Sequence, residues 1–198
     1  MGLENQGSKP KGRTGIIFGK LMNAFHTGIY IKYFNNNLPV DNSVILDIGC
    51  GGGKFLKYLS AKNSTYRLFG LDHSEEMVSL SQKINQETIK QNRMEIFLGS
   101  VINIPVNNDL IDMVTAFETV QFWPDIERSF TEIARVLKKG GVFTIINWYP
   151  REGSKWWKIA KLKSEKEYIM QFENSGFEKV VTDLNYKKGW IIIKGIKK

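Results

Sequence analysis

The chain has 198 residues, of which 42% are hydrophobic and 24% are charged, and its net charge is +8. This length and composition are typical of a soluble protein with one sizeable domain and are short for two domains. The single cysteine, Cys50, has no partner in the chain. A disulfide framework is therefore excluded, and a reducing compartment is favoured.

Positive charge is concentrated towards both ends of the chain. Residues 1–40 and 149–198 carry net charges of +4 and +6, whereas residues 41–148 carry −2. Basic flanks attract anionic substrates, RNA or membrane surfaces. Here the excess is spread out, rich in Lys and poor in Arg, which favours solubilising lysines. No stretch has the length of a membrane span without charges, and no cleavage site follows the N-terminal lysines, so we expect a cytoplasmic protein.

The first 40 residues form a separate part of the predicted organisation. Residues 1–14 are polar and are expected to form a mobile tail. Residues 15–34 have apolar side chains at helical spacing, which predicts a helix that caps the rest of the chain. Residues 41–198 are predicted to form one domain, in which 149–163 do not fit the sheet and are interpreted as a substrate-side insertion.

A glycine-rich turn follows the first predicted strand. Residues 44–48 (V-I-L-D-I) are typical of a buried strand, four glycines fall within residues 49–53, and helical spacing begins at Lys54. Such a turn lets a ligand approach the backbone at a helix N-terminus. A dinucleotide motif would need a glycine where Lys54 stands, and Asp47 would repel a pyrophosphate. Asp47 suits a cationic ligand better.

The segment D-I-G-C-G-G-G, residues 47–53, resembles motif I of the class I S-adenosylmethionine-dependent methyltransferases. This resemblance implies that the turn binds the amino-acid end of S-adenosylmethionine. An acid at the end of the next strand, Asp72, follows the turn at about the 20 residues expected for a group that binds the ribose hydroxyls. The contacts implied for this part of the cofactor are Asp47, Gly49, Cys50, Gly51, Asp72, His73 and Met77.

Three later segments extend the resemblance to residue 148. A strand at 94–98 is followed by Gly99 and Ser100, where Ser100 replaces the aspartate that the family commonly uses for adenine, although a hydroxyl can also accept a hydrogen bond. A strand at 110–117 is followed by E-T-V-Q-F-W-P-D, and R-V-L-K-K-G-G-V-F is similar to the family's motif III. The further cofactor contacts implied are Ser100, Val101, Phe117 and Glu118.

The order of elements predicts an α/β fold. Strands and helices alternate and end in a hairpin of two strands, at 177–184 and 189–196. The helix after Pro124 is predicted to end at a glycine cap at residues 140 and 141, and Ser164 to Glu167 reads as a capping box. The resemblance implies a Rossmann-like, doubly wound, seven-stranded and mostly parallel sheet whose last strand is antiparallel.

Substrate contacts are sought at the strand ends and on the cap helix. For His26 a role as base or substrate ligand competes with an ordinary histidine bonded to backbone, and for Trp156 an apolar pocket or a membrane contact competes with simple packing. Glu118 and His26 are the candidate catalytic groups. Two histidines and one cysteine at no ligand spacing predict no metal site. The candidate substrate contacts are Asn23, His26, Tyr30, Trp123, Tyr149 and Trp156.

The sequence therefore predicts methyl transfer from S-adenosylmethionine to a small molecule, mainly by binding and alignment. The acceptor and the oligomeric state stay open. An RNA methyltransferase that uses the basic flanks is the alternative enzyme, and a non-catalytic S-adenosylmethionine-binding regulatory protein is the alternative of another class. A nicotinamide oxidoreductase is disfavoured by Asp47 and Lys54.

Overall fold

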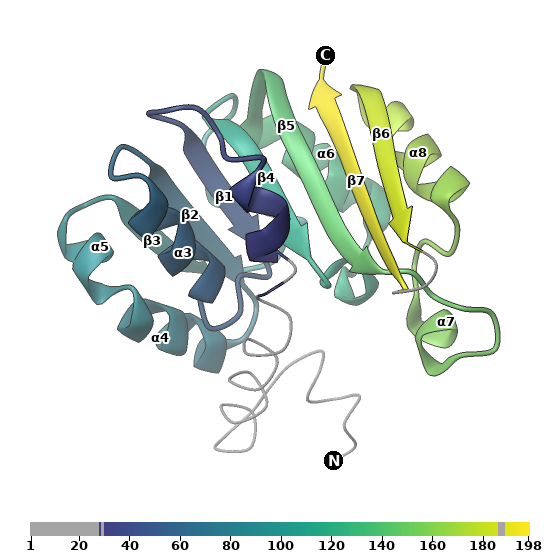
Figure 1. Ribbon diagram of the computed structural model, residues 1–198, viewed down its shortest axis with the longest axis horizontal. Helices are drawn as coiled ribbons and strands as arrows, with labels where there is room; N and C mark the ends of the chain where they lie inside the picture. The colour runs from purple at the N-terminus through teal and green to yellow at the C-terminus, as the bar shows by residue number, and fades with distance from the viewer. Residues whose placement is uncertain (1–27, 29, 186–188) are drawn as a thin grey trace. The chain divides into compact units, whose positions relative to one another are not determined.

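The structure is a computed structural model that describes residue 28, residues 30–185 and residues 189–198 (Figure 1). The chain divides into two compact units, of which the first ends at Ser100 and the second begins at Val101. In the first unit the elements are β1 (Val44–Ile48), α3 (Lys54–Lys62), β2 (Arg67–Asp72), α4 (Glu75–Ile84), α5 (Gln86–Lys90) and β3 (Met94–Leu98). In the second they are β4 (Ile111–Phe117), η1 (Val120–Phe122), α6 (Ile126–Val136), β5 (Leu137–Trp148), α7 (Lys155–Ile159), α8 (Glu165–Asn174), β6 (Phe177–Asn185) and β7 (Trp190–Lys197).

The three strands of the first unit are parallel and lie in the order β3-β2-β1. Ile48 pairs with Leu71, and Asp72 pairs with Leu98, so all three strands end at the same edge. Apart from half-buried Val44, the apolar side chains of β1 and β2 are buried, as near-continuous apolar runs in a parallel sheet require. This edge is where the chain enters the glycine turn.

Two helices of the first unit pack against β2 and against each other. Helix α3 buries Phe55, Leu56 and Leu59, which recur at helical spacing. Residues 30–35 are also helical, and Phe34 packs its ring 5.0 Å from that of Phe55. The described residues of the predicted cap helix are thus helical, its capping role stays a prediction, and residues 1–27 and 29 lie outside the described residues.

The second unit contains the reversed strand. Strands β4 and β5 are parallel, β7 is antiparallel to β5, and β6 is antiparallel to β7. Within this unit β7 therefore runs against β4, β5 and β6. The predicted mostly parallel α/β architecture with an antiparallel last strand is confirmed.

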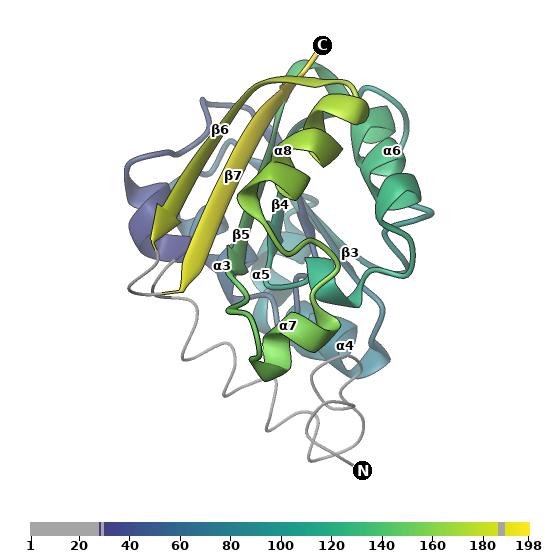
Figure 2. The same ribbon diagram turned by 90° about the vertical axis from the view of Figure 1, so that its right-hand side faces the viewer.

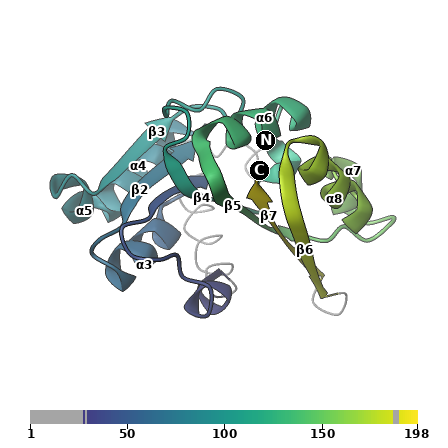
Figure 3. The same ribbon diagram turned by 90° about the horizontal axis from the view of Figure 1, so that it is seen from above.

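Aromatic side chains fill the core between the helices and strands of the second unit. Helices α6 and α8 lie on one side of β5, β7 and β6 (Figures 2 and 3). Phe143 of β5 stacks on Phe172 of α8 at 5.0 Å, and Phe130 of α6 meets Phe172 edge-on at 5.2 Å. Phe177 completes the cluster, and all four side chains are fully buried.

The predicted glycine cap of α6 is wrong. The helix ends at Val136, and β5 begins at once with Leu137, which pairs with Ile111 of β4. Gly140, at φ +77°, therefore lies inside the strand, where the register with β4 shifts between Ile111 and Met113. A glycine with positive φ serves a bulge as well as a helix cap, so the local sequence pattern did not distinguish the two.

Helix starts agree more closely with the sequence. The Ser164 hydroxyl accepts a hydrogen bond from the Glu167 amide at 3.2 Å, as the predicted capping box requires. The Glu167 carboxylate, however, accepts from the Lys163 amide at 2.6 Å. Asp125, one residue after Pro124, caps α6 by accepting from the Arg128 amide at 3.0 Å. The short helix α5 was not predicted.

Among the helices of the described residues, none combines the length and the apolar character that crossing a membrane would require.

We expect Phe172→Ala to lower the free energy of unfolding by about 3–5 kcal/mol, because it empties the centre of the aromatic cluster. Met170→Ala is the matched control on the same helix, since its side chain is 51% exposed and its loss should cost less than about 0.5 kcal/mol. Urea unfolding followed by circular dichroism measures both. Equal losses in the two variants would contradict the assignment of the core.

Candidate functional site

The glycine turn is fixed to the end of β2 by backbone hydrogen bonds. The amides of Gly49 and Cys50 both donate to the carbonyl of Leu71, at 2.7 and 3.1 Å. Gly49 and Gly51 have φ values of +69° and +51°, which side chains rarely adopt. The glycines predicted from sequence are thus needed for the path of the backbone itself.

Asp72 joins this turn to the next helix. Its Oδ2 accepts a hydrogen bond from the Gly51 amide at 2.9 Å, and its Oδ1 accepts from the Ser74 amide at 2.9 Å. Ser74 is the N-cap residue of α4. One carboxylate, only 7% exposed, therefore holds both loops that leave the strand ends. Burial raises the pKa of Asp72, although the backbone hydrogen bonds oppose this shift.

The buried carboxylates of Asp47 and Asp72 both act on the Cys50 thiol of the glycine turn. Burial raises the pKa of Cys50 well above its ordinary value, and the negative charges of Asp72 and Asp47 raise it further. Both carboxylates are thus close enough to act on the same sulfur. A thiol in such surroundings stays protonated and is a poor nucleophile, so the geometry gives Cys50 a packing role. Two negative charges beside the turn favour a cationic ligand over an anionic one.

Gly53 is required for packing rather than for ligand approach. It adopts φ +74°, and a Cβ at this position would lie 2.2 Å from Ser81 Oγ and 2.5 Å from Asn85 Nδ2. Asn85 Nδ2 donates to the Gly53 carbonyl at 3.0 Å and to the Ser81 carbonyl at 2.9 Å. The end of α4 therefore packs against the start of α3 and is hydrogen-bonded to it. Sequence reasoning missed Asn85, because no local pattern connects it to a turn 32 residues earlier.

The other predicted residues of the first unit lie along the same strand ends. The Gly99 amide donates to the Asp72 carbonyl at 2.9 Å, which places half-buried Ser100 directly after β3 beside the end of β2. His73 is exposed, with Nδ1 3.9 Å from Asp72 Oδ1, whereas Met77 is buried in α4. Tyr30, predicted to touch substrate, is 9% exposed. Asn23 and His26 lie outside the described residues.

In the second unit, polar side chains gather where β4 and β5 end. Glu118 is buried and adopts φ +56°, an uncommon conformation for a residue other than glycine, while its amide donates to the Ile146 carbonyl at 2.9 Å. Gln121 Nε2 donates to the Glu118 carbonyl at 2.5 Å. Asn147 Nδ2 donates to the Tyr168 hydroxyl at 2.9 Å. Sequence reasoning selected Glu118 but missed Gln121, Asn147 and Tyr168.

The remaining predicted residues of the second unit have mixed environments. Trp123 is 4% exposed and stacks on Phe143 of the aromatic core, so packing alone accounts for its position. Val101 and Phe117 are buried, and Tyr149 is half-buried with its amide bonded to the Gly189 carbonyl at 2.8 Å. The side chain of Trp156 lies outside the described residues. The predicted ligand contacts of these residues stay predictions.

Within the part of the chain that the structure describes, no group of three or more His, Cys, Asp or Glu side chains is arranged to hold a metal ion.

Comparisons with known proteins agree with this geometry. A family model described as "Methyltransferase domain" matches residues 46–145. The chain is 30% identical to 2-methyl-6-phytyl-1,4-hydroquinone methyltransferase of Arabidopsis thaliana over 146 residues, which are 69% of the chain and 40% of that protein. It is 31% identical to sterol 24-C-methyltransferase erg6 of Schizosaccharomyces pombe over 122 residues, which are 60% of the chain and 31% of that protein. The chain thus spans well under half of both relatives.

A solved structure shows the same fold. Geranyl diphosphate C-methyltransferase of Streptomyces coelicolor, in complex with Mg2+, geranyl diphosphate and S-adenosyl-L-homocysteine, superposes with a TM-score of 0.73. The match has 16% identity and covers 96% of this chain and 86% of that chain. At this identity the likeness establishes the architecture alone, and the predicted Rossmann-like fold is confirmed.

We expect Gly53→Ala to destabilise the protein more than Gly140→Ala. Both residues have positive φ, at +74° and +77°, so both variants carry a backbone cost of about 1–2 kcal/mol. A Cβ at Gly140 meets nothing within 4 Å, whereas a Cβ at Gly53 overlaps Ser81 and Asn85, which adds about 1–3 kcal/mol. Urea unfolding compares the two variants, and equal losses would show that Gly53 serves the backbone alone.

Proposed function

Because the chain belongs to the class I S-adenosylmethionine-dependent methyltransferase family, whose domain matches residues 46–145, we propose that it transfers the methyl group of S-adenosylmethionine to a small molecule. The observation that carries this proposal is the pair of buried carboxylates at the glycine turn: Asp72 accepts from the Gly51 amide, and Asp47 and Asp72 both lie close enough to Cys50 to raise the pKa of its thiol. S-adenosylmethionine supplies an electrophilic methyl group on a sulfonium when bound, and carries positive charge. The two acids suit such a cation and would repel the pyrophosphate of a dinucleotide.

The proposed roles of the turn residues follow from the groups that they present. Asp72 holds its carboxylate at the strand edge, where it can accept from the two ribose hydroxyls. Gly49 and Gly51 leave space for the amino-acid end of the ligand, and Asp47 faces its charged ammonium or sulfonium. Ser100, which follows β3, is proposed to accept from adenine. Cys50, His73 and Met77 shape the walls around these groups.

Catalysis by this chain then depends on alignment. Holding the acceptor in line with the reacting carbon can contribute about 7–11 kcal/mol, and exclusion of water strengthens each contact. Glu118 is the proposed residue for holding a proton of the acceptor, since a carboxylate at the end of β4 lies where ligands bind in open α/β sheets. Val101 and Phe117 are proposed as apolar neighbours of the ligand.

Apolar small molecules are the acceptor class that we propose. The relatives named above act on a phytyl hydroquinone and on a sterol, and both names describe compounds with large apolar bodies. Incubation of the purified chain with methyl-tritiated S-adenosylmethionine and a lipid extract should yield organic-soluble label, and Asp72→Ala should abolish it. Tight binding of S-adenosylhomocysteine without any label transfer would favour the regulatory alternative. Binding of NAD in its place would overturn the proposal.

We expect Asp72→Asn to weaken the binding of S-adenosylhomocysteine by about tenfold to a hundredfold, because a charged hydrogen bond contributes about 1.5–3 kcal/mol. Asp109→Asn is the control, since this carboxylate is 65% exposed in an ion pair with Lys197. Isothermal titration calorimetry measures both affinities, and circular dichroism checks the fold. Unchanged affinity in the Asp72 variant would contradict the ribose role.

The affinity should also fall at acidic pH. Ribose hydroxyls donate to the ionised carboxylate, and burial raises the pKa of Asp72, so binding should weaken at a pH above that at which a free aspartate protonates. For the ligand-free protein the effect of pH has the opposite sign. Because the pKa of Asp72 is higher in the folded than in the unfolded state, this group adds to the free energy of unfolding as the pH falls. Calorimetry over a pH series measures the effect, and Asp72→Asn should remove that dependence. A wild-type affinity that stays constant over the series would contradict it.

A further inference from the structure

A short basic segment between β5 and α8 carries none of the residues proposed to contact the cofactor. Residues 151–163, here called the basic loop, contain five Lys or Arg and one Glu, for a net charge of +4. Four of the five cations are lysines, and they are interspersed with tryptophan, isoleucine and leucine in K-W-W-K-I-A-K-L-K. The sequence thus combines a local positive charge with large apolar side chains.

The basic loop lies beyond the end of β5 rather than against the strands. Figures 1 and 2 show its helix, α7, past the point where β5 ends and outside the strands of this unit. In the second unit this is the end at which β4 and β5 present Glu118 and Asn147. The carboxyl ends of parallel strands are where ligands bind in this class of sheet. The loop is therefore on the side from which an acceptor would approach these strands.

Charged and apolar side chains of the loop are exposed together. Lys158 and Lys161 are exposed, and Ile159 between them is 37% exposed. The ammonium of Lys163 lies 5.3 Å from the centre of the half-buried Trp157 ring. Leu162 is 8% exposed, so its side chain packs in the hydrophobic core and anchors the loop there. Folding within this unit thus leaves an isoleucine uncovered among lysines.

This arrangement matches the chemistry of a membrane surface. Tryptophan sits at the interface between lipid and water, lysines extend their charged ends to anionic headgroups, and aliphatic side chains enter the acyl boundary. Each Lys near an anionic bilayer strengthens binding about fivefold, equivalent to about 1 kcal/mol. RNA would be recognised by arginine and by stacked aromatic rings, yet the loop has one Arg, and among its described side chains the exposed large apolar one, Ile159, is aliphatic.

We infer that the basic loop docks the protein on anionic lipid bilayers. The docking follows from the loop itself, whereas its purpose rests on the proposed function: a bilayer-bound loop would bring the ends of β4 and β5 next to the medium in which apolar acceptors dissolve. The observed exposed isoleucine would enter the interface, and Lys158 and Lys161 would contact lipid phosphates. Binding should therefore need both anionic lipid and the apolar side chain.

Co-sedimentation with vesicles tests the inference on the full chain. The wild type should bind vesicles of phosphatidylcholine with phosphatidylglycerol at low salt, bind pure phosphatidylcholine weakly, and lose most binding at high salt. Lys158→Glu with Lys161→Glu should reduce binding by at least about tenfold, since two attractive charges become repulsive. Ile159→Ser should reduce binding several-fold with the net charge unchanged.

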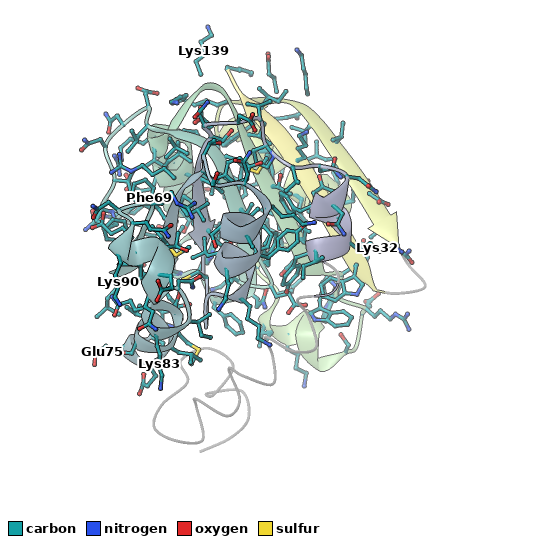
Figure 4. The ribbon with its side chains drawn as sticks, turned by 60° about the vertical axis from the view of Figure 1, so that its left-hand side comes forward. Lys32, Phe69, Glu75, Lys83, Lys90 and Lys139 are labelled. Carbon is teal, nitrogen blue, oxygen red and sulfur yellow. The ribbon has the colours of Figure 1, made fainter. Side chains whose placement is uncertain are left out.

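A matched charge reversal elsewhere is the control. Lys83 of α4 and Lys90 of α5 are exposed lysines whose side chains point outwards in Figure 4. Lys83→Glu with Lys90→Glu changes the net charge by the same amount and should leave most vesicle binding intact. Equal losses in both double variants would overturn the inference in favour of unspecific attraction. Absence of wild-type binding, or retention by bulk tRNA instead of vesicles, would also overturn it.

Calorimetry with S-adenosylhomocysteine separates this inference from the proposed function. All loop variants should keep the wild-type affinity, because they leave every residue of the proposed cofactor site unchanged. A wild type that binds vesicles but no S-adenosylhomocysteine would refute the proposed function and leave the docking in place.

Discussion

The two hydrogen bonds of the Asp72 carboxylate are the constraint on which the first unit depends. They bind the Gly51 amide and the Ser74 amide, at 2.9 Å each, and so join the turn after β1 to the start of α4. These hydrogen bonds fix the position of the carboxylate, and they offset the cost of burying a polar group. The proposed ribose contact uses the acceptor capacity that remains on the two oxygens. Structure and ligand binding are thereby linked in one side chain.

Three glycines of the turn have different physical reasons for being glycine. Gly49 and Gly51 follow a backbone path with positive φ beside the end of β2. Gly53 has the same sign of φ but is also confined by Ser81 and Asn85. A turn that is held by the Leu71 carbonyl, by Asp72 and by α4 is rigid before any ligand arrives. A rigid turn loses less conformational entropy when a ligand binds.

The sequence predicted the features that local physics controls. Strands β1 and β3 begin and end where their apolar runs do, and Ser164 caps α8 as its spacing indicates. The family resemblance in residues 47–53 supplied the Rossmann-like architecture. Features that depend on contacts between distant residues could not be predicted from the sequence. Gly140 lies in a bulge because Leu137 pairs with β4. Asn85 donates to the Gly53 carbonyl only once α4 has packed against the turn. The pairs Gln121–Glu118 and Asn147–Tyr168 likewise depend on how strand ends meet their neighbours.

The basic loop and the glycine turn belong to different units and carry different parts of the account, namely membrane docking and cofactor binding. Cofactor binding by the glycine turn is tested most directly by a crystal structure with S-adenosylhomocysteine. We predict that the ribose hydroxyls donate to Asp72, that the amino-acid end lies over Gly49 and Gly51, and that Asp47 faces its ammonium group. A ligand bound elsewhere, or an Asp72 carboxylate that touches only its own backbone partners, would contradict the claim.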